Sequence, residues 1–269
     1  MKFQLYTTGL YSSYCYNESF NVLFDAGEGA ATTLRNRVYG VNHIFISHDH
    51  WDHIGGLIGL LTIRNAARGD RDKEINVYFS KKLTRMQEVI DLAKKRGAKN
   101  VKFIKIDAGF QLKLKNNIFV EAFDVQHSKG SLGYKIVEKR SRLIESFRTK
   151  SREAIITAKQ NGIAVTEDYE HPLFVYALDA YRFDIGHIEN ADWWIADTTF
   201  LKEEDRDGKT HASLKEVVSQ AHYANVKNTV LGHISPRYNE KESFGALKLT
   251  KRSVHHKIYI PKQGKFYHI

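Results

Sequence analysis

The stretch ISHDHWDHIGGL, residues 46–57, concentrates three histidines and two aspartates between two apolar flanks. Residues 41–48 have the apolar pattern of a buried strand, and residues 54–67 have the pattern of a helix. Neutral imidazoles and carboxylates are the ligands that borderline metals prefer, and zinc is the commonest match. A solvated polar loop is the alternative, but His-x-His-x-Asp-His is a spacing with few other uses. The stretch therefore predicts a metal centre at a strand end, with four ligands: His48, His50, Asp52 and His53.

Three more candidate ligands lie far along the chain. Each ends an apolar run that predicts a strand: His127 ends IFVEAFDVQH, Asp179 ends HPLFVYALD, and His233 ends NTVLGH. Taken singly, a His or Asp at a strand end is usually a cap or turn residue. Together with the loop they make seven ligands, the number that two adjacent metals need when they share one carboxylate.

The elements that must position these ligands form a mixed α/β pattern. Helices are expected at residues 30–40, 54–67, 83–97, 140–162 and 213–226, the last beginning with a capping box of Ser213 and Glu216. Strands are expected over most of the remaining apolar runs. Residues 257–269 are expected to form a terminal hairpin. No G-x-G-x-x-G follows the first strand, so the pattern favours a sandwich over a dinucleotide-binding sheet.

Composition restricts the partners and the compartment. The 269 residues carry a net charge of +10, which favours an anionic partner such as nucleic acid, nucleotide or phosphate. No run of about 18 apolar residues is present, so we expect no membrane-spanning helix. The start, MKFQLYTTGL, lacks the apolar segment of a signal peptide. The one cysteine, Cys15, fits a reducing compartment, so we expect the cytoplasm, or the host cytoplasm if the chain is phage-encoded.

In combination, these motifs resemble the metallo-β-lactamase fold and, more narrowly, its ribonuclease Z-like branch. The resemblance rests on HDHWDH and on four further stretches: LFDAGEG at 23–29, DWWIADTTF at 192–200, KTHASLKE at 209–216 and GHISPRY at 232–238. It implies a four-layer αββα sandwich in a single domain, residues 1–269, with a basic helical insert near residues 139–162.

The resemblance also implies a two-zinc centre, with manganese as the alternative metal. One zinc is expected on His48, His50 and His127, and the other on Asp52, His53 and His233, with Asp179 bridging them. Asp25 is expected either to orient a ligand through hydrogen bonds or to serve as a turn residue before Gly27.

The expected chemistry is hydrolysis of a phosphodiester. Two metals hold a hydroxide and a phosphoryl oxygen together, and Asp52 orients the hydroxide or takes its proton. The leaving alkoxide needs a proton, and in this branch a histidine steered by a carboxylate supplies it. The matching residues are His211 and Asp197, although the branch usually has Glu where this chain has Asp197; a helix-start role is the alternative for His211. Arg237 either braces its loop or touches phosphate.

β-Lactam and thioester hydrolysis, other reactions of this fold, fit less well. β-Lactamases are normally exported, whereas we expect no signal peptide here, and thioester hydrolysis does not account for the ribonuclease Z-like motifs. Ribonuclease Z cuts the 3′ trailer from tRNA precursors and grips the tRNA with a Gly- and Pro-rich arm between the third and fourth motifs. No such segment is visible here between His127 and Asp179, which favours a smaller substrate.

The chain also resembles the anti-Pycsar phosphodiesterases, compact homodimers that open 3′,5′-cyclic mononucleotides such as cyclic UMP and cyclic CMP. For such a substrate the candidate stacking residues are Tyr11, Tyr14 and Tyr169. A ribonuclease Z-type tRNA 3′ endonuclease and a non-catalytic nucleic-acid-binding member of the fold are the alternatives.

Overall fold

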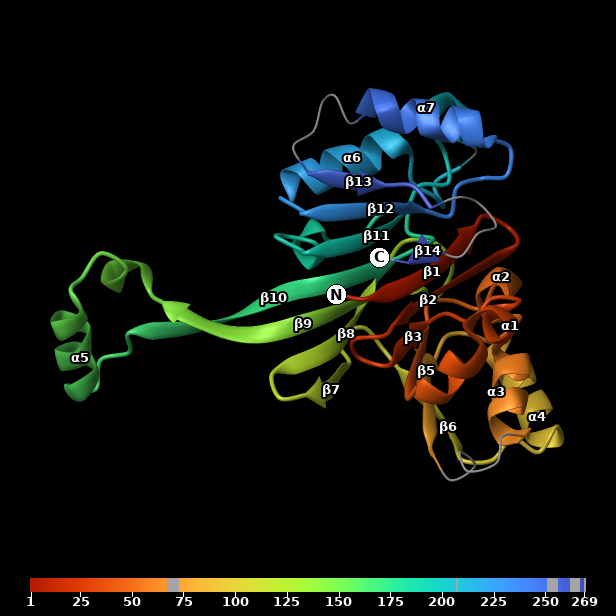
Figure 1. Ribbon diagram of the computed structural model, residues 1–269, viewed down its shortest axis with the longest axis horizontal. Helices are drawn as coiled ribbons and strands as arrows, with labels where there is room; N and C mark the ends of the chain where they lie inside the picture. The colour runs from red at the N-terminus through yellow and green to blue at the C-terminus, as the bar shows by residue number, and fades with distance from the viewer. Residues whose placement is uncertain (67–72, 207, 251–255, 262–266, 269) are drawn as a thin grey trace.

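The computed structural model describes residues 1–66, 73–206, 208–250, 256–261 and 267–268, and it contains two seven-stranded sheets packed face to face (Figure 1). The first sheet has the order β14-β1-β2-β3-β4-β5-β6. Its strands are β1 Phe3–Thr8, β2 Ser12–Asn17, β3 Val22–Phe24, β4 His43–Ile46, β5 Ile75–Ser80, β6 Val101–Ile106 and β14 Tyr267–His268. Strands β3 to β6 are parallel, and β4 and β5 are mostly apolar and buried because both faces of a central parallel strand are covered.

The second sheet has the order β13-β12-β11-β10-β9-β8-β7. Its strands are β7 Gln111–Lys115, β8 Ile118–Asp124, β9 Leu132–Leu143, β10 Thr166–Ala177, β11 Trp193–Asp197, β12 Asn228–Gly232 and β13 Lys257–Tyr259. The parallel strands β10 to β13 mirror those of the first sheet. The expected terminal hairpin is therefore wrong: β13 pairs with β12 in the second sheet, whereas β14 pairs with β1 in the first.

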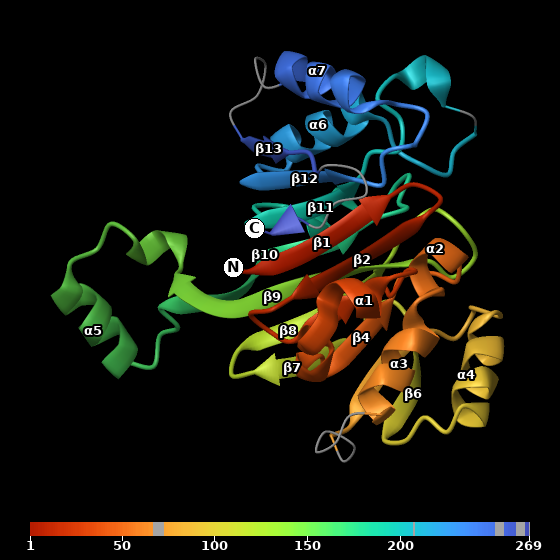
Figure 2. The same ribbon diagram turned by 45° about the vertical axis from the view of Figure 1, so that its right-hand side comes forward.

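Helices cover the outer face of each sheet (Figures 1 and 2). On the first sheet lie α1 Ala30–Leu34, the 3₁₀ turn η1 Arg35–Gly40, α2 Trp51–Ile54, α3 Leu57–Ala66 and α4 Met86–Lys95. On the second lie α6 Leu214–Tyr223 and α7 Glu240–Thr250, with the 3₁₀ turns η3 Ile185–His187 and η4 Glu203–Asp205 nearby. This arrangement confirms the expected four-layer αββα sandwich. Helix α6 begins with the predicted capping box of Ser213 and Glu216.

The core between the sheets aligns their edges. It is rich in buried aromatic rings, including Phe24, which stacks on Phe174 and Tyr176 of the opposite sheet at centroid distances of 5.7 and 5.2 Å. Such packed ring pairs stabilise the sheet–sheet contact beyond the area they bury. As a result, the carboxyl ends of β4, β10 and β12 meet at one edge of the sandwich, where polar loops follow.

Strands β9 and β10 continue beyond the sheet as a two-stranded arm (Figure 1). Strand β8 pairs with β9 only as far as Glu138, whereas residues 139–143 continue to pair with residues 166–170. The tip holds the 3₁₀ turn η2 Glu145–Phe147 and helix α5 Arg152–Gln160, capped by Ser151. The helical prediction for residues 140–162 is thus wrong over its first part. Both faces of this ribbon are solvated, so its strand carries no apolar alternation to reveal it.

Candidate metal centre

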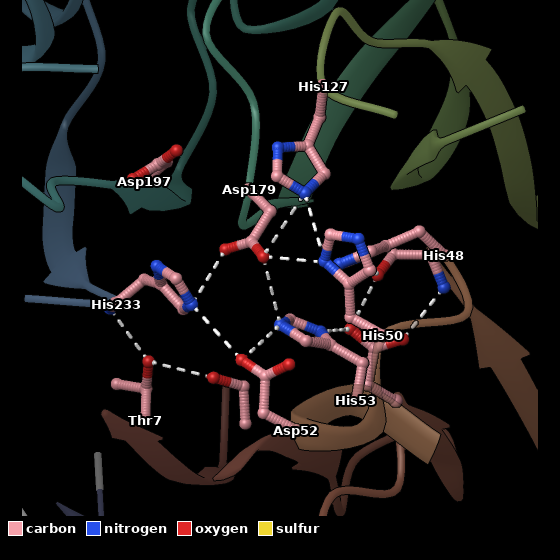
Figure 3. A network of polar contacts seen from close by, with 12 residues as sticks. Thr7, His48, His50, Asp52, His53, His127, Asp179, Asp197 and His233 are labelled. Carbon is pink, nitrogen blue, oxygen red and sulfur yellow. Dashed lines mark hydrogen bonds and ion pairs between the residues drawn. The ribbon is translucent and has the colours of Figure 1, made fainter. Parts of the chain in front are cut away.

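Two groups of histidine and aspartate side chains meet at the shared edge of the two sheets (Figure 3). Within each group the ligand atoms lie within 4.8 Å of one another. One group is His48, His50, His127 and Asp179, and the other is Asp52, His53, Asp179 and His233. The grouping is the one expected from the sequence, with Asp179 common to both.

Asp179 lies at the middle of the arrangement. Its Oδ2 atom is 3.2 Å from Nε2 of His48 and 3.2 Å from Nε2 of His53, and its Oδ1 atom is 3.0 Å from Nε2 of His233. Nε2 of His127 is 3.7 Å away. The backbone of Asp179 has a φ of 53°, a conformation that a non-glycine residue rarely adopts and that local packing must enforce.

Each loop that carries ligands follows directly from a strand. His48 comes two residues after β4, His127 three residues after β8, Asp179 two residues after β10, and His233 immediately after β12. His50 caps the short helix α2, whose first turn carries Asp52 and His53. Because four strands end at one edge, side chains more than 180 residues apart in the chain come within contact distance.

In four of the histidines, the ring nitrogen that points away from the centre, Nδ1, makes a hydrogen bond that orients the ring. Nδ1 of His53 lies 2.7 Å from Oδ2 of Asp25, and Nδ1 of His127 lies 3.0 Å from the carbonyl oxygen of Thr210. Each acceptor lacks a proton, so Nδ1 donates and Nε2 keeps a free lone pair.

The other two rings are fixed through a hydroxyl. Ser47 Oγ donates to Asp25 Oδ2 at 2.7 Å, and it therefore accepts from Nδ1 of His48 at 3.0 Å. In the same way Thr199 Oγ1 donates to Asp197 at 2.7 Å and accepts from Nδ1 of His233 at 2.9 Å. In the neutral form of each of these four rings, the lone pair is therefore on Nε2, which faces the centre.

Buried polar atoms without hydrogen-bond partners indicate that these residues can hold a metal ion. Among the described residues, Nε2 of His48, Nε2 of His53 and Oδ1 of Asp179 are buried and lack a hydrogen-bond partner. Buried polar atoms without partners are costly unless something else satisfies them. Donor sets of imidazole nitrogen and carboxylate oxygen suit a borderline divalent ion such as zinc.

Electrostatics set the protonation state of the ligands. Burial lowers the pKa of the His53 imidazole, but Asp179 and Asp25 outweigh it and raise that pKa well above its usual range, so a metal that binds this ring has to displace a proton. Burial lowers the pKa of the His48 imidazole well below its usual range, which keeps the ring neutral. Burial opposes ionisation of Asp52, but the hydrogen bond from His233 and the charge of His53 outweigh it and lower the pKa to about 2. Asp179 is likewise held well below the usual pKa of a carboxyl, chiefly by His233 and His53 acting against burial.

His211 and Asp197 stand beside the second group. Nδ1 of His211 lies 3.0 Å from Oδ2 of Asp197, and the His211 ring stacks on that of His233 with centroids 5.1 Å apart. Burial lowers the pKa of His211, but the Asp197 carboxylate more than offsets it and raises the pKa to about 9. The shorter Asp197 side chain therefore still reaches its histidine.

Asp25 lies behind the ligands, buried, with a φ of 57°. Its carboxylate accepts hydrogen bonds from the Ser47 backbone N–H, the Ser47 hydroxyl, His53 and the Tyr176 hydroxyl. The contact with His53 is the arrangement expected of a residue that orients a ligand.

The candidate substrate contacts are scattered. Tyr11 lies on the turn between β1 and β2 and is 67% exposed. Tyr14 is fully buried and stacks on Tyr6, so the expectation that it contacts substrate is wrong. Tyr169 is also misplaced: it lies on the arm ten residues before Asp179, roughly 33 Å along an extended strand. Its ring instead packs under Arg142, 4.8 Å away.

Arg237 braces its loop. Its guanidinium donates to the backbone carbonyl of Asp205 at 3.0 Å and lies over the Phe200 ring. Sequence reasoning missed the orienting residues Ser47, Thr199 and Thr210. Thr199 occurs in the ADTTF stretch, but nothing in that stretch separates an orienting threonine from an ordinary strand-end residue.

Comparisons with known proteins identify the family and the fold. The family model described as a beta-lactamase superfamily domain matches residues 20–234. A ribonuclease Z from Saccharolobus solfataricus is 27% identical over 261 residues, covering 87% of this chain and 85% of that protein. The crystal structure of the metallo-beta-lactamase fold protein YhfI from Bacillus subtilis superposes with a TM-score of 0.68 and 17% identity, covering all of both chains. The short form of human tRNase Z superposes with a TM-score of 0.66 and 17% identity, covering 99% of this chain and 98% of that one.

No helix in the described part of the chain has both the length and the apolar character needed to span a bilayer.

Proposed function

Because the chain belongs to the beta-lactamase superfamily, with the histidine and aspartate cluster of a metal-dependent hydrolase, we propose that it hydrolyses a nucleotide phosphodiester. The observation that carries the proposal is the His211–Asp197 pair beside the two ligand groups. A phosphodiester has an alkoxide leaving group that needs a proton, and a histidine held by a carboxylate can donate one. β-Lactam hydrolysis has no alkoxide leaving group for such a pair to protonate.

The ligands in this proposal are the seven predicted from the sequence. His48, His50 and His127 would hold one divalent ion, Asp52, His53 and His233 would hold the other, and Asp179 would contribute to both. When bound, the ions stabilise charge on phosphoryl oxygens and lower the pKa of a water molecule. Zinc suits these ligands, and manganese is the alternative.

Two side chains of the protein transfer protons in this proposal. Asp52, an ionised carboxylate at the mouth of the second group, orients the attacking water and accepts its proton. His211 donates its Nε2 proton to the leaving oxygen, since Nδ1 is held by Asp197. Asp197 is anchored in turn by the backbone N–H groups of Ala180 and Thr199, each at 3.0 Å, so the proton donor has a fixed direction.

Two substrates remain in the proposal. One is RNA, as in a ribonuclease Z-type 3′ endonuclease, which is supported by the relatives. It is also supported by the arm of β9 and β10, which lies between His127 and Asp179, where the sequence showed no Gly- and Pro-rich segment. The arm tip carries Arg148, Lys150, Arg152 and Lys159 and extends away from the metal centre (Figure 1). Asp179 and the start of β10 are separated by thirteen residues, roughly 40 Å of strand, a span that suits a polymer.

A 3′,5′-cyclic mononucleotide such as cyclic UMP or cyclic CMP is the second substrate. It is supported by the pairing of the arm's stalk cations with the arm's own acids: Arg142 contacts Glu167 at 2.8 Å, and Lys139 contacts Glu170 at 3.8 Å. Cations neutralised in this way attract a polyanion less. The homodimer expected for that group of enzymes belongs to this second proposal, and light scattering tests it.

The deciding experiment is a substrate panel. Purified protein with zinc or manganese is offered a 3′-extended tRNA precursor, cyclic UMP, cyclic CMP and bis-p-nitrophenyl phosphate, with Asp179→Ala as the inactive control. RNA cleavage is expected to weaken steeply with salt, because phosphate contacts release counterions, and to fall in a Lys150→Ala/Arg152→Ala variant. Turnover of a cyclic mononucleotide is expected to respond to neither change. If metal binds but every diester stays intact, a nucleic-acid-binding role replaces hydrolysis.

A further inference from the structure

Three large apolar side chains are exposed beside the metal centre. Leu10, Tyr11 and Trp51 are 78%, 67% and 57% exposed. Single exposed apolar residues are common, but a tryptophan is highly buried on average. Here the three come from two segments that both adjoin metal ligands: residues 10 and 11 lie on the β1–β2 turn, and residue 51 is the first residue of α2.

Backbone contacts hold these two segments against each other and against the centre. The N–H of Gly9 donates to the carbonyl of Ile234, the residue after His233, at 3.2 Å. Gly27 fits between the segments: a Cβ there would lie 2.2 Å from the Asp52 carbonyl oxygen and 2.5 Å from the Ser12 hydroxyl. Figures 1 and 2 both show α2 beside the β1–β2 turn. The exposed side chains therefore belong to the rim of one site.

Trp51 is the best-placed of the three for substrate. It lies between His50 and Asp52, each in a different ligand group, so its backbone position is fixed by the residues that bind metal. Within the described chain, neither Trp51 nor Tyr11 packs its ring against another aromatic ring, and more than half of the Trp51 surface is exposed. Tyr14 and Tyr169 are excluded by their positions, which leaves Tyr11 as the other candidate stacking residue at the rim.

We propose that Trp51 is the surface on which the nucleobase next to the scissile phosphate stacks, with Tyr11 and Leu10 as flanking contacts. The inference rests on the proposed function, because only a nucleotide substrate brings a base to this rim. Every base has a π-face, and stacking on an aromatic side chain contributes about 1–3 kcal/mol per base. Trp51 thereby sets affinity for the nucleotide without reading its sequence.

The test uses the indole itself as the reporter. Uridine 5′-monophosphate and adenosine 5′-monophosphate are titrated into wild-type protein, with and without zinc, and tryptophan fluorescence is recorded. Ribose 5-phosphate, which lacks a base, is the matched ligand control. Trp194 is buried, and Trp193 packs against Phe3 and Tyr259 at the amino end of β11, so stacking is expected to quench Trp51; the quenching should be absent with ribose 5-phosphate and lost in Trp51→Phe.

Affinity provides the second measurement, by calorimetry with the same two nucleotides. Trp51→Ala is expected to weaken binding by between about 5-fold and 100-fold. Trp51→Phe, which keeps a smaller ring, is expected to weaken it less. Tyr223→Ala removes a side chain that is 80% exposed on α6, away from the ligand groups, and should bind as the wild type does.

Four outcomes decide the inference. Equal nucleotide affinity in wild type and Trp51→Ala overturns it, and so does a change in oligomeric state in that variant, which would assign Trp51 to a subunit contact. If diesters are hydrolysed but Trp51→Ala leaves the KM unchanged, this inference fails and the proposed function stands. If no diester is hydrolysed and nucleotides still quench Trp51, the proposed function fails and nucleotide binding at Trp51 stands.

Discussion

Nδ1 of His211 lies 3.0 Å from Oδ2 of Asp197, while Oδ1 of the same carboxylate accepts hydrogen bonds from the N–H and the hydroxyl of Thr199. Thr199 in turn accepts from His233. One carboxylate thus orients both the candidate proton donor and, through a hydroxyl, a candidate metal ligand. Different variants separate the two roles: His211→Ala removes the proton donor, and Thr199→Val removes the hydroxyl that orients the ligand.

Replacing His211 by Ala is expected to lower activity by an amount that depends on the leaving group of the substrate. Hydrolysis of a nucleotide diester should fall by about 10²- to 10⁴-fold, because an alkoxide leaves poorly without a proton. Hydrolysis of bis-p-nitrophenyl phosphate should fall far less, because nitrophenolate is stable unprotonated. Initial rates on both substrates, at matched metal content, give the comparison. An equal loss on both would mean that His211 acts on binding or on structure instead. Asp197→Asn should follow the same pattern.

Replacing Thr199 by Val is expected to weaken one metal position and spare the other. The change keeps the volume of the side chain and removes the hydroxyl that orients His233, and loss of such a contact typically costs 10- to 100-fold in metal affinity. Competition with a chelator measures the two binding steps. Thr229→Val is the matched control, since Thr229 is buried in β12 away from the ligands. Weakening of both steps, or of neither, would contradict the assignment.

Tyr176→Phe is expected to destabilise the fold. The Tyr176 hydroxyl donates to Asp25 at 2.8 Å, and a hydrogen bond to a charged group contributes about 1.5–3 kcal/mol. Tyr134→Phe removes a hydroxyl that donates to the neutral Ile46 carbonyl at 2.6 Å, for which about 0.5–1.5 kcal/mol is expected. Urea unfolding of the two variants ranks the contacts, and a larger loss at Tyr134 would refute the ranking.

Acidification is expected to weaken the fold through His43. Burial lowers the pKa of this imidazole, so the folded chain favours its neutral form. Its contribution to stability is therefore complete above the unfolded pKa of about 6.5 and is lost as the pH falls through the lowered folded value. The free energy of unfolding of wild type minus that of His43→Gln should thus decrease between pH 8 and pH 5. A difference that stays constant with pH would show that His43 does not contribute in this way.

Sequence reasoning succeeds where residue type and spacing alone restrict the chemistry. His48 to His53 form such a pattern, and the strand-end positions of His127, Asp179 and His233 predicted their convergence. It failed where the deciding information was tertiary. Tyr14 has the same local pattern as a rim tyrosine, yet its strand faces the core. Residues 140–143 form a strand only because residues 166–169 pair with them, and the partner of β14 lies more than 250 residues away in β1.

Each ligand group draws on both sheets: His48, His50, Asp52 and His53 follow a strand of the first, whereas His127, Asp179 and His233 follow strands of the second. Asp25 spans the same seam, since it contacts His53 on one side and Tyr176 on the other. Neither half of the chain alone contains a full donor set. Metal affinity therefore depends on how the two sheets pack against each other. A core substitution far from any ligand that shifts one sheet against the other is expected to weaken metal binding.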